Sequence, residues 1–316
     1  MTTVNSVLGP IDTAALGFTL MHEHILSSSA GVSENYPELL GPRFLERIVK
    51  GLTEVKKEGI DTIVDATTLD LGRDVKVLAE ASRRSGVNII ACTGWWLEMP
   101  RFISTVSSDQ FAQLFFREIR EGIAGTNIKA GILKAASDMA GVTPFEETVL
   151  RAVARAHLET NVPIMVHSYS PGQVGVQQLA ILKEEGVDPR RIKFDHSNDT
   201  TDVEYLTWLL EEGCYLGLDR YPGRGVSSLS RTKTMKALIN AGYAGRLCPS
   251  HDWSLVSVTA ETSPQMQAER EKRNPYGYLY MKKVVIPQLR ELGVAEPVLD
   301  DLCVKGPRNF FEGAAV

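Results

Sequence analysis

Two histidines separated by one residue, His22 and His24, lie in the first strand-like run of the chain, Phe18-Thr-Leu-Met-His-Glu-His-Ile25. In an extended strand the side chains of residues i and i+2 point to the same face, so both imidazoles would face one direction. A neutral imidazole is a common ligand of zinc and similar ions, and two on one face could hold a single metal ion. Because a hydrogen-bonded or exposed His-x-His pair also arises by chance, this pair alone is a weak indication.

Further residues with metal-ligand chemistry stand at the ends of later strand-like runs. Taken singly, each has an ordinary structural interpretation, such as a buried histidine bonded to a carbonyl or an aspartate that caps a helix. Taken together, they favour convergence on one site. A lysine ammonium is a donor only and cannot ligate a cation, so a lysine beside metal ions must be neutral, modified or turned away. These residues are Lys134, His167, His196 and Asp252, with His251 beside the last of them, whereas His157 lies inside a predicted helix.

The elements that would position these residues alternate between short apolar runs and amphipathic stretches. The strand-like runs are 18–24, 60–65, 87–93, 130–134, 162–167, 191–196, 215–219 and 247–252. The helix-like stretches are 44–57, 74–85, 110–124, 146–160, 175–185, 201–212 and 232–241. Several helices end in a glycine followed by a new strand, which is the usual left-handed cap. Eight such units predict a (β/α)8 TIM barrel, in which catalytic groups gather at the carboxyl ends of the strands.

The whole chain, residues 1–316, is expected to form a single barrel domain, because no linker or low-complexity tract interrupts the pattern. The last unit, 276–292, is followed by an extra C-terminal helix predicted over 296–311. A doubly wound open sheet is the alternative architecture. It is disfavoured because no strand-like run is followed by the glycine-rich phosphate-binding motifs typical of such folds.

Composition restricts the compartment and the partners. A net charge of −5 without any Lys/Arg-rich run argues against a nucleic-acid partner. No stretch approaches the roughly 18 apolar residues of a membrane span, and the first residues lack the pattern of a signal peptide. The four cysteines are scattered, and none forms a C-x-x-C pair, which is typical of reduced thiols. We therefore expect a cytoplasmic protein with no membrane or nucleic-acid partner.

The polar motifs resemble those of the phosphotriesterase family of the amidohydrolase superfamily, including its lactonase branch. They run in order across nearly the whole chain, and the order His-x-His, Lys, His, His, Asp over eight strands is shared by few other families. The matching segments are Thr19-Leu-Met-His-Glu-His24, Gly131-Ile-Leu-Lys134, Val166-His-Ser168, Asp195-His-Ser-Asn-Asp-Thr-Thr-Asp202, Gly217-Leu-Asp-Arg-Tyr221 and Ser250-His-Asp252.

The resemblance implies a binuclear metal centre with a more buried and a more exposed ion. Zinc is the preferred metal, although iron, cobalt and manganese suit the same kinds of ligand. The implied ligands are His22, His24 and Asp252 for the buried ion and His167 and His196 for the exposed ion.

Lys134 has a special place in the implied centre. Carboxylation by CO2 would turn its amine into a carbamate, an anionic oxygen ligand that bridges both ions and removes the charge conflict. A hydroxide that also bridges the ions would attack an ester carbonyl or phosphoryl group. Asp252 would accept or shuttle the proton. The resemblance therefore implies metal-assisted ester hydrolysis.

Residues around the implied centre bear on the substrate. Arg220, which follows the seventh strand, resembles the lactonase branch. Trp96 falls where many lactonases have a tyrosine, and it resembles the phosphotriesterase branch instead. Asp199 matches a second acidic residue of the family, and with Arg220 and Asp252 it could form a charge-linked chain at the barrel mouth. A salt bridge from Arg220 to Asp199 or Asp219 is the structural alternative. Arg220 and Asp199 are thus candidate catalytic residues beside Asp252.

The segment 253–274 is expected to be a long loop with an apolar start, and its charged run, 269–273, is expected to form a solvated helical face. Asp195 should point toward the helices, because strand alternation turns it away from His196. A buried carboxylate at that place would need a partner. The residues expected to line the substrate pocket are Trp96, Tyr169, Arg220, Tyr221 and Trp253.

The leading hypothesis is a binuclear metal-dependent hydrolase of lactones or related carboxylic esters, with weaker phosphotriesterase activity. An amidase or an acyclic carboxylesterase on the same centre is the main alternative. A mononuclear deaminase of the same superfamily is disfavoured by Lys134, and a non-catalytic binding protein is disfavoured because all six ligands are present. The resemblance also implies a homodimer formed through loops such as residues 95–103.

Overall fold

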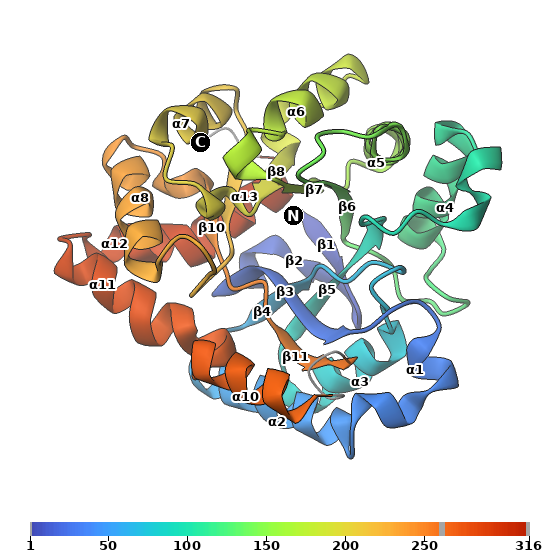
Figure 1. Cartoon of the computed structure of the whole chain (residues 1–316), viewed down its shortest axis with the longest axis horizontal. Helices are drawn as coiled ribbons and strands as arrows, with labels where there is room; N and C mark the ends of the chain where they lie inside the picture. Colours follow the sequence, from blue (N-terminus) through green and yellow to red (C-terminus); the bar gives the residue numbers. More distant parts are fainter. Residues whose placement is uncertain (1, 259–262, 314–316) are drawn as a thin grey trace.

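A curled sheet of parallel strands lies at the centre of the computed structural model, which describes residues 2–258 and 263–313, and helices surround it (Figure 1). The strand order in this sheet is β10-β9-β8-β7-β6-β5-β4-β3-β11. The strands are β3 (Thr19–Ser27), β4 (Thr62–Asp65), β5 (Asn88–Gly94), β6 (Ile132–Ser137), β7 (Ile164–Ser168), β8 (Ile192–Asp195), β9 (Tyr215–Leu218), β10 (Leu247–Pro249) and β11 (Ser254–Ser257).

Strands β10 and β11 together take the place of an eighth barrel strand. β10 pairs with β9, and β11 pairs with β3 on the other side. Between them, the Asp252 N–H donates to the His22 carbonyl oxygen at 3.1 Å, and the His24 N–H donates to the Trp253 carbonyl oxygen at 2.8 Å. These bonds join the two ends of the sheet, so the predicted (β/α)8 barrel is confirmed.

The helices that connect the strands cover the outside of the barrel. The predicted glycine caps are confirmed, because Gly59, Gly86 and Gly186 have φ angles of 75°, 74° and 92°. Thr143 and Glu146 form a capping box at the start of α5, in which each side chain accepts from the backbone N–H of the other residue. The helices are α1 (Val32–Asn35), α2 (Phe44–Lys57), α3 (Val75–Ser85), α4 (Ser108–Arg120), α5 (Pro144–Thr160), α6 (Gly175–Glu184), α7 (Val203–Glu211) and α8 (Ser228–Asn240).

Strand alternation divides the apolar side chains between two cores. Along β7, Ile164 and Val166 pack outward in the large core beneath the helices, whereas Met165 belongs to a smaller core inside the barrel. His167 stands two residues after Met165 and therefore also faces inward. The inward positions thus change from apolar to polar toward the carboxyl ends of the strands, and the polar site rests on a packed apolar floor.

The amino end of the barrel is covered by a hairpin that was not predicted. It consists of β1 (Thr3–Ser6) and β2 (Gly9–Asp12), which pair antiparallel. The Asn5 side-chain amide donates to the Ala130 carbonyl oxygen at 3.1 Å, just before β6 begins. The hairpin therefore lies on the side of the barrel opposite to the carboxyl strand ends.

The chain ends in helical segments that follow α11 (Ile286–Glu291). They are α12 (Glu296–Asp300), a π-helical turn (Asp301–Lys305) and α13 (Gly306–Glu312), which together match the extra helix predicted over 296–311. Phe310 and Phe311 of α13 pack in the core inside the barrel. This helix therefore contributes to the barrel core and not only to its surface.

The prediction of a long loop over 253–274 is wrong. This segment contains β11 and α10 (Pro264–Arg273), and the Ser263 hydroxyl caps α10 by accepting from the Met266 N–H at 3.4 Å. The strand was missed because it is four residues long and depends on pairing with β3, which is remote in sequence. The solvated helical face predicted for the charged run 269–273 is confirmed, because this run forms the second half of α10, which has no buried residues.

Two further observations concern the whole described chain. The four cysteines are buried free thiols, as the sequence predicted. None of the helices in the described ranges combines the length and the apolar character that a membrane crossing requires.

Candidate metal centre

The structure brings all six predicted ligands together at the carboxyl ends of the strands. They line a cavity of about 210 Å³, which Ser27, Leu71, Trp96, Arg220 and Ser254 also line. The ligand candidates are His22 and His24 on β3, Lys134 on β6, His167 on β7, His196 directly after β8, and Asp252 between β10 and β11.

A local irregularity of β3 turns its two histidines into the barrel. The register against β4 shifts between Leu20 and Glu23, as in a β-bulge. Met21 packs in the core inside the barrel, and its neighbour His22 nevertheless reaches the same interior. His22 and His24 lie on one side with ring centroids 5.5 Å apart.

Lys134 is buried beside the first histidine of the pair. Its Nζ lies 3.2 Å from Nε2 of His22, and the residue is only 1% exposed. Burial lowers the pKa of Lys134 below its ordinary value, which favours the neutral amine. The geometry therefore places this nitrogen among imidazoles, where an ammonium would be poorly tolerated.

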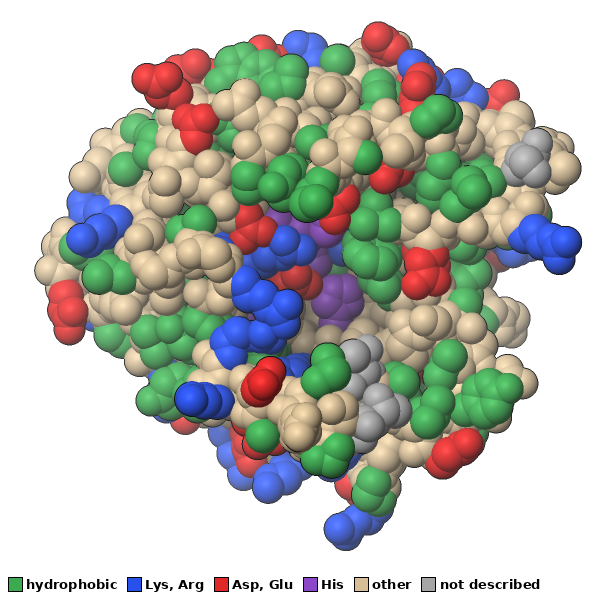
Figure 2. Space-filling model, in the orientation of Figure 1, with side chains coloured by type: hydrophobic (Ala, Val, Ile, Leu, Met, Phe, Trp, Pro, Cys, Tyr) green, Lys and Arg blue, Asp and Glu red, His purple; other side chains and the backbone are tan. Residues whose placement is uncertain are grey.

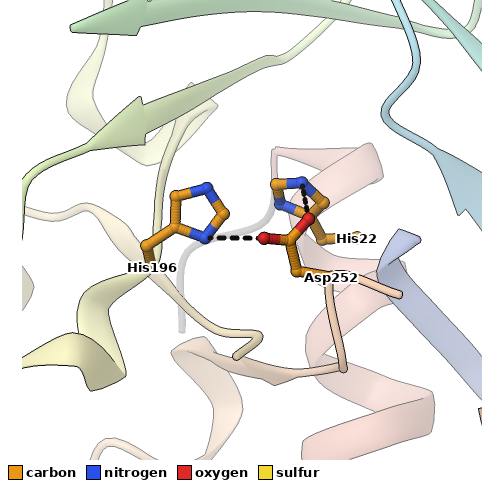
Figure 3. A group of neighbouring side chains, drawn as sticks. All are labelled: His22, His196 and Asp252. Atoms are coloured by element: carbon orange, nitrogen blue, oxygen red, sulfur yellow. Dashed lines mark ion pairs between the residues drawn. The ribbon is translucent and has the colours of Figure 1, made fainter. Parts of the chain in front are cut away.

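The Asp252 carboxylate lies between histidines from two sides of the barrel (Figure 3). Its Oδ1 is 3.2 Å from Nε2 of His24 and 3.5 Å from Nε2 of His22, and its Oδ2 is 3.8 Å from Nδ1 of His196. The backbone of Asp252 has a φ of 52°, an unusual value for a residue other than glycine. Burial raises the pKa of Asp252, but His196, His24 and His22 outweigh it and hold this pKa well below its ordinary value.

His167 and His196 form a close pair on the other side of the cavity. Nε2 of His196 lies 2.8 Å from Nδ1 of His167. Burial lowers the pKa of His167 to about 3 and also lowers the pKa of His196. Both rings are therefore neutral near pH 7, and neutral imidazoles offer the lone pairs that a metal ion needs.

One carboxylate orients two of these imidazoles. Asp219, at the end of β9, accepts from Nδ1–H of His22 at 3.1 Å and from Nδ1–H of His196 at 2.9 Å. Burial raises its pKa, but the two imidazoles outweigh burial and hold the pKa of Asp219 well below its ordinary value. With Nδ1 protonated in both rings, each Nε2 presents a lone pair toward the cavity, which is the arrangement that carboxylates give to metal-binding histidines.

Two groups in the described chain have metal-ligand geometry. In the first, ligand atoms of His22, His196 and Asp252 all lie within 4.8 Å of one another. The second consists of His22, Asp195 and Asp219. The second group would use Nδ1 of His22, whose N–H donates to Asp219. Its aspartates, Asp195 and Asp219, are not among the described residues that line the cavity. The first group faces the cavity, and its imidazole and carboxylate donors fit zinc and similar ions.

Comparison with known proteins agrees with this geometry. The model of the phosphotriesterase family matches residues 2–311. The chain belongs to the phosphotriesterase family. A solved structure of the phosphotriesterase from Mycobacterium tuberculosis is 36% identical, with a TM-score of 0.92 and 98% of each chain covered. An aryldialkylphosphatase from Saccharolobus solfataricus is 34% identical, covering 95% of this chain and 96% of the relative. An N-acetyltaurine hydrolase from Xenopus tropicalis is 26% identical, covering 97% of both.

In this member of the phosphotriesterase family, a chain of charges crosses the barrel mouth as the sequence suggested. The Arg220 guanidinium donates to Asp252 at 3.1 Å and to Asp199 at 2.5 Å. Asp199 also forms an ion pair of 2.8 Å with Arg231, whose side chain is fully buried. Arg220 therefore forms the predicted salt bridge with Asp199, and it also lines the cavity.

Trp96 forms part of the cavity wall, as expected. Its indole Nε1–H donates to Nδ1 of His167 at 3.4 Å. The buried carboxylate of Asp70 accepts from the Trp96 backbone N–H at 3.2 Å and from the Glu98 N–H at 3.4 Å, which fixes the loop after β5. Asp70 was not predicted, although a lone acidic residue soon after the second strand was a visible signal.

The other predicted pocket residues divide into two groups. Tyr221 and Trp253, with Arg220, line a second cavity of about 360 Å³ beside the first. Tyr169 is not among the described residues that line either cavity, and its place in the substrate pocket stays a prediction. Its ring packs against Gly172, within the short 3-10 turn Ser170–Gly172 that begins directly after it.

The predicted orientation of Asp195 is wrong. Its Oδ2 lies 3.1 Å from Nδ1 of His22, and its Oδ1 is ion-paired with Lys193 inside the barrel. Along β8, Phe194 packs outward, so its neighbours Lys193 and Asp195 face inward. His196 also faces inward because it leaves the strand with a φ of 60°, which breaks the alternation that the prediction assumed. Lys193 is the partner that the buried carboxylate required.

The two remaining histidines have structural partners. Nδ1 of His251 lies 2.5 Å from the Glu23 carboxylate, and its Nε2 accepts from the Met281 N–H at 3.0 Å. Nδ1–H of His157, in α5, donates to the Val162 carbonyl oxygen at 2.8 Å. Both are thus fixed within the fold, and neither lies among the six ligand candidates.

Proposed function

We propose that this protein is a binuclear metal-dependent hydrolase of lactones or related carboxylic esters, with weaker phosphotriesterase activity. The observation that carries the proposal is the convergence of four histidines, Lys134 and Asp252 on one cavity of a phosphotriesterase-family barrel. Asp219 supports it further, because it leaves the Nε2 lone pairs of two of these histidines facing the cavity.

The six side chains would hold two divalent ions, with zinc preferred. Lys134 would bridge them as a carbamate, since an unmodified ammonium at 3.2 Å from the His22 nitrogen would repel any cation. When bound, the ions would activate water for attack and polarise the scissile carbonyl or phosphoryl oxygen.

The residues around the ligands would orient the site and exclude water. Arg220 holds the Asp252 carboxylate at 3.1 Å, which keeps this proton acceptor directed into the cavity. Trp96 closes one wall beside His167 with an apolar ring. Because Trp96 has no hydroxyl, it would contribute shape and desolvation, and it would supply neither a proton nor an acceptor.

The test is metal analysis of the purified protein combined with a hydrolysis screen before and after chelation. The screen would include γ-lactones, δ-lactones, aryl esters and a phosphotriester. We expect about two metal ions per chain and turnover of lactones or esters that chelation removes and added zinc restores. A metal-free chain that cannot be reconstituted and is inert toward every substrate would overturn the proposal and favour a binding protein.

An amide substrate is the second candidate. It is favoured by the relative named N-acetyltaurine hydrolase, which aligns with 97% of this chain. Adding N-acetylated amino acids and aminosulfonates to the same screen separates the two candidates. Chelator-sensitive amide cleavage without ester or lactone turnover would replace the ester assignment and keep the metal centre.

A further inference from the structure

The second cavity at the barrel mouth adjoins the proposed metal centre directly. Its volume is about 360 Å³, and it shares Arg220 and Asp252 with the central cavity. Figure 2 shows Lys and Arg side chains gathered along one side of the central hollow, next to the histidines. A substrate held at the proposed centre would therefore extend past these cations.

The acidic residues of this second cavity are already engaged. Asp199 is bound by Arg220 at 2.5 Å and by Arg231 at 2.8 Å. Asp252 is bound by Arg220 at 3.1 Å, and it also contacts His24 at 3.2 Å. Both carboxylates are therefore paired with Arg220, and neither forms an ion pair with Arg224 or Arg273 in the described part of the chain.

Two arginines of the same cavity form no ion pair with any carboxylate in the described part of the chain. Arg224 lies in the loop between β9 and α8, and Arg273 is the last residue of α10; within the described ranges, neither forms an ion pair with a carboxylate. Glu269 lines a neighbouring cavity with both arginines, but it does not pair with them among the described residues. Both arginines line the same cavity, and burial and then the nearby charge of Arg224 lower the pKa of Arg273.

Trp253 lies beside one of these two arginines, Arg273. The Arg273 guanidinium lies 5.7 Å from the Trp253 ring centroid, and Arg270 stacks closer on the same ring at 4.2 Å. Cation–π contact of this kind limits the positions that a long side chain samples. An anion between Arg224 and Arg273 would thus meet a partly ordered site beside an aromatic wall.

We propose that the substrate carries an anionic group, a carboxylate, sulfonate or phosphate monoester, which Arg224 and Arg273 bind beside the hydrolysed bond. The guanidinium fork matches the oxygens of such groups and forms paired, charge-assisted hydrogen bonds. The local positive charge stands out because the whole chain has a net charge of −5. This inference rests on the proposed hydrolase activity and names its substrate class.

The test compares two chromogenic esters of matched length, mono-4-nitrophenyl glutarate, which ends in a carboxylate, and 4-nitrophenyl pentanoate, which is neutral. The metal-loaded wild-type protein should favour the charged ester in kcat/KM by about tenfold, the size expected for hydrogen bonds to charged groups. The double variant Arg224→Gln/Arg273→Gln should lose this preference and keep its rate with the neutral ester. Lys272→Gln is the matched control, since it removes an exposed cation of α10 that is not among the described residues lining the cavity.

Charge-reversed variants and added salt provide two further tests of the preference for the charged ester. Arg224→Glu/Arg273→Glu should disfavour the charged ester relative to the neutral one, and Arg224→Lys/Arg273→Lys should retain part of the preference. Added salt should weaken the wild-type preference, because both arginines are accessible to solvent. Circular dichroism checks that each variant is folded. An equal rate for the two esters in the wild type, or a preference that survives Arg→Gln substitution, would overturn the anion site.

Binding separates this inference from the proposed activity. Equilibrium dialysis measures retention of glutarate, which carries the anionic group but no ester bond, by the wild-type protein and by the Arg→Gln double variant. Arginine-dependent retention without turnover of any ester would keep the anion site and overturn ester hydrolysis. Turnover without arginine dependence would keep the hydrolase and overturn the anion site.

Discussion

Asp219 is the residue on which the orientation of the proposed centre depends, because one carboxylate serves two imidazoles. In Asp219→Asn the side chain keeps its shape, but its nitrogen can no longer accept from a ring N–H, so His22 or His196 loses a partner. We expect metal affinity to fall by about 10–100-fold. Titration of the loaded protein with a competing chelator measures this, and Asp188→Asn, at a remote 3-10 turn, is the control. Equal chelator titrations for Asp219→Asn and wild type would contradict the assigned role.

A second prediction concerns the buried ion pair of Lys193 and Asp195. Both side chains are fully buried, so removing one partner leaves an uncompensated charge inside the barrel. Lys193→Met should lower the free energy of unfolding by about 3–5 kcal/mol. The double variant Lys193→Met/Asp195→Ala should lose less, because no unpaired charge remains. Urea denaturation gives the free energy of unfolding of the wild type, of Lys193→Met and of the double variant. A double variant less stable than Lys193→Met would disprove the coupling between the two charges.

Individual site residues were predictable where type and strand position agree. His167 and Lys134 face the cavity because strand alternation is regular along β7 and β6. Asp195 was misplaced because the positive φ of His196 cannot be read from a non-glycine residue in the sequence.

At the scale of elements, α5 contains a titratable group that couples stability to pH. Burial lowers the pKa of His157 below its ordinary value of 6.5, and Arg191 lowers it further. As the pH falls below 6.5, His157 takes up a proton in the unfolded chain but stays neutral in the folded chain, so the free energy of unfolding decreases. The free energy of unfolding of wild type should therefore fall more steeply from about pH 7 to about pH 5 than that of His157→Gln. Parallel slopes for the two proteins would exclude His157 as the cause.

Elements with strong local signals were predicted nearly to the residue, and those without were missed. The predicted helix over 44–57 has the same bounds as α2, since its apolar spacing alone specifies the buried face. The strands β1, β2 and β11 have four residues each. β11 pairs with β3, which is remote in sequence, and the hairpin of β1 and β2 is held at the amino end of the barrel by a bond to Ala130. Short sequences of this kind carry too little periodicity to separate a strand from a loop.

For the whole molecule, the order of units was sufficient to predict a barrel, because repeated strand–helix units with short connections have few solutions. What the order left open is how the last strand closes the sheet. The structure answers this with an interrupted strand, in which the segment between β10 and β11 carries Asp252 into the cavity. The same interruption that closes the barrel thus positions a proposed ligand.

A final prediction concerns the oligomeric state of the protein. We expect a homodimer that forms through residues 95–103. Two large apolar side chains are exposed there, Met99 by 66% and Phe102 by 42%, and a dimer interface would bury them. Size-exclusion chromatography with light scattering should give a dimer for wild type and a monomer for Met99→Glu/Phe102→Glu. Leu158→Glu, at a 55% exposed position on the outer face of α5, is the control and should remain dimeric. A wild-type monomer, or a double variant that stays dimeric, would remove this loop from the interface. Because this loop contains Trp96, loss of the dimer should also weaken the cavity wall and lower kcat/KM, whereas a dimer that forms elsewhere would leave the rate unchanged.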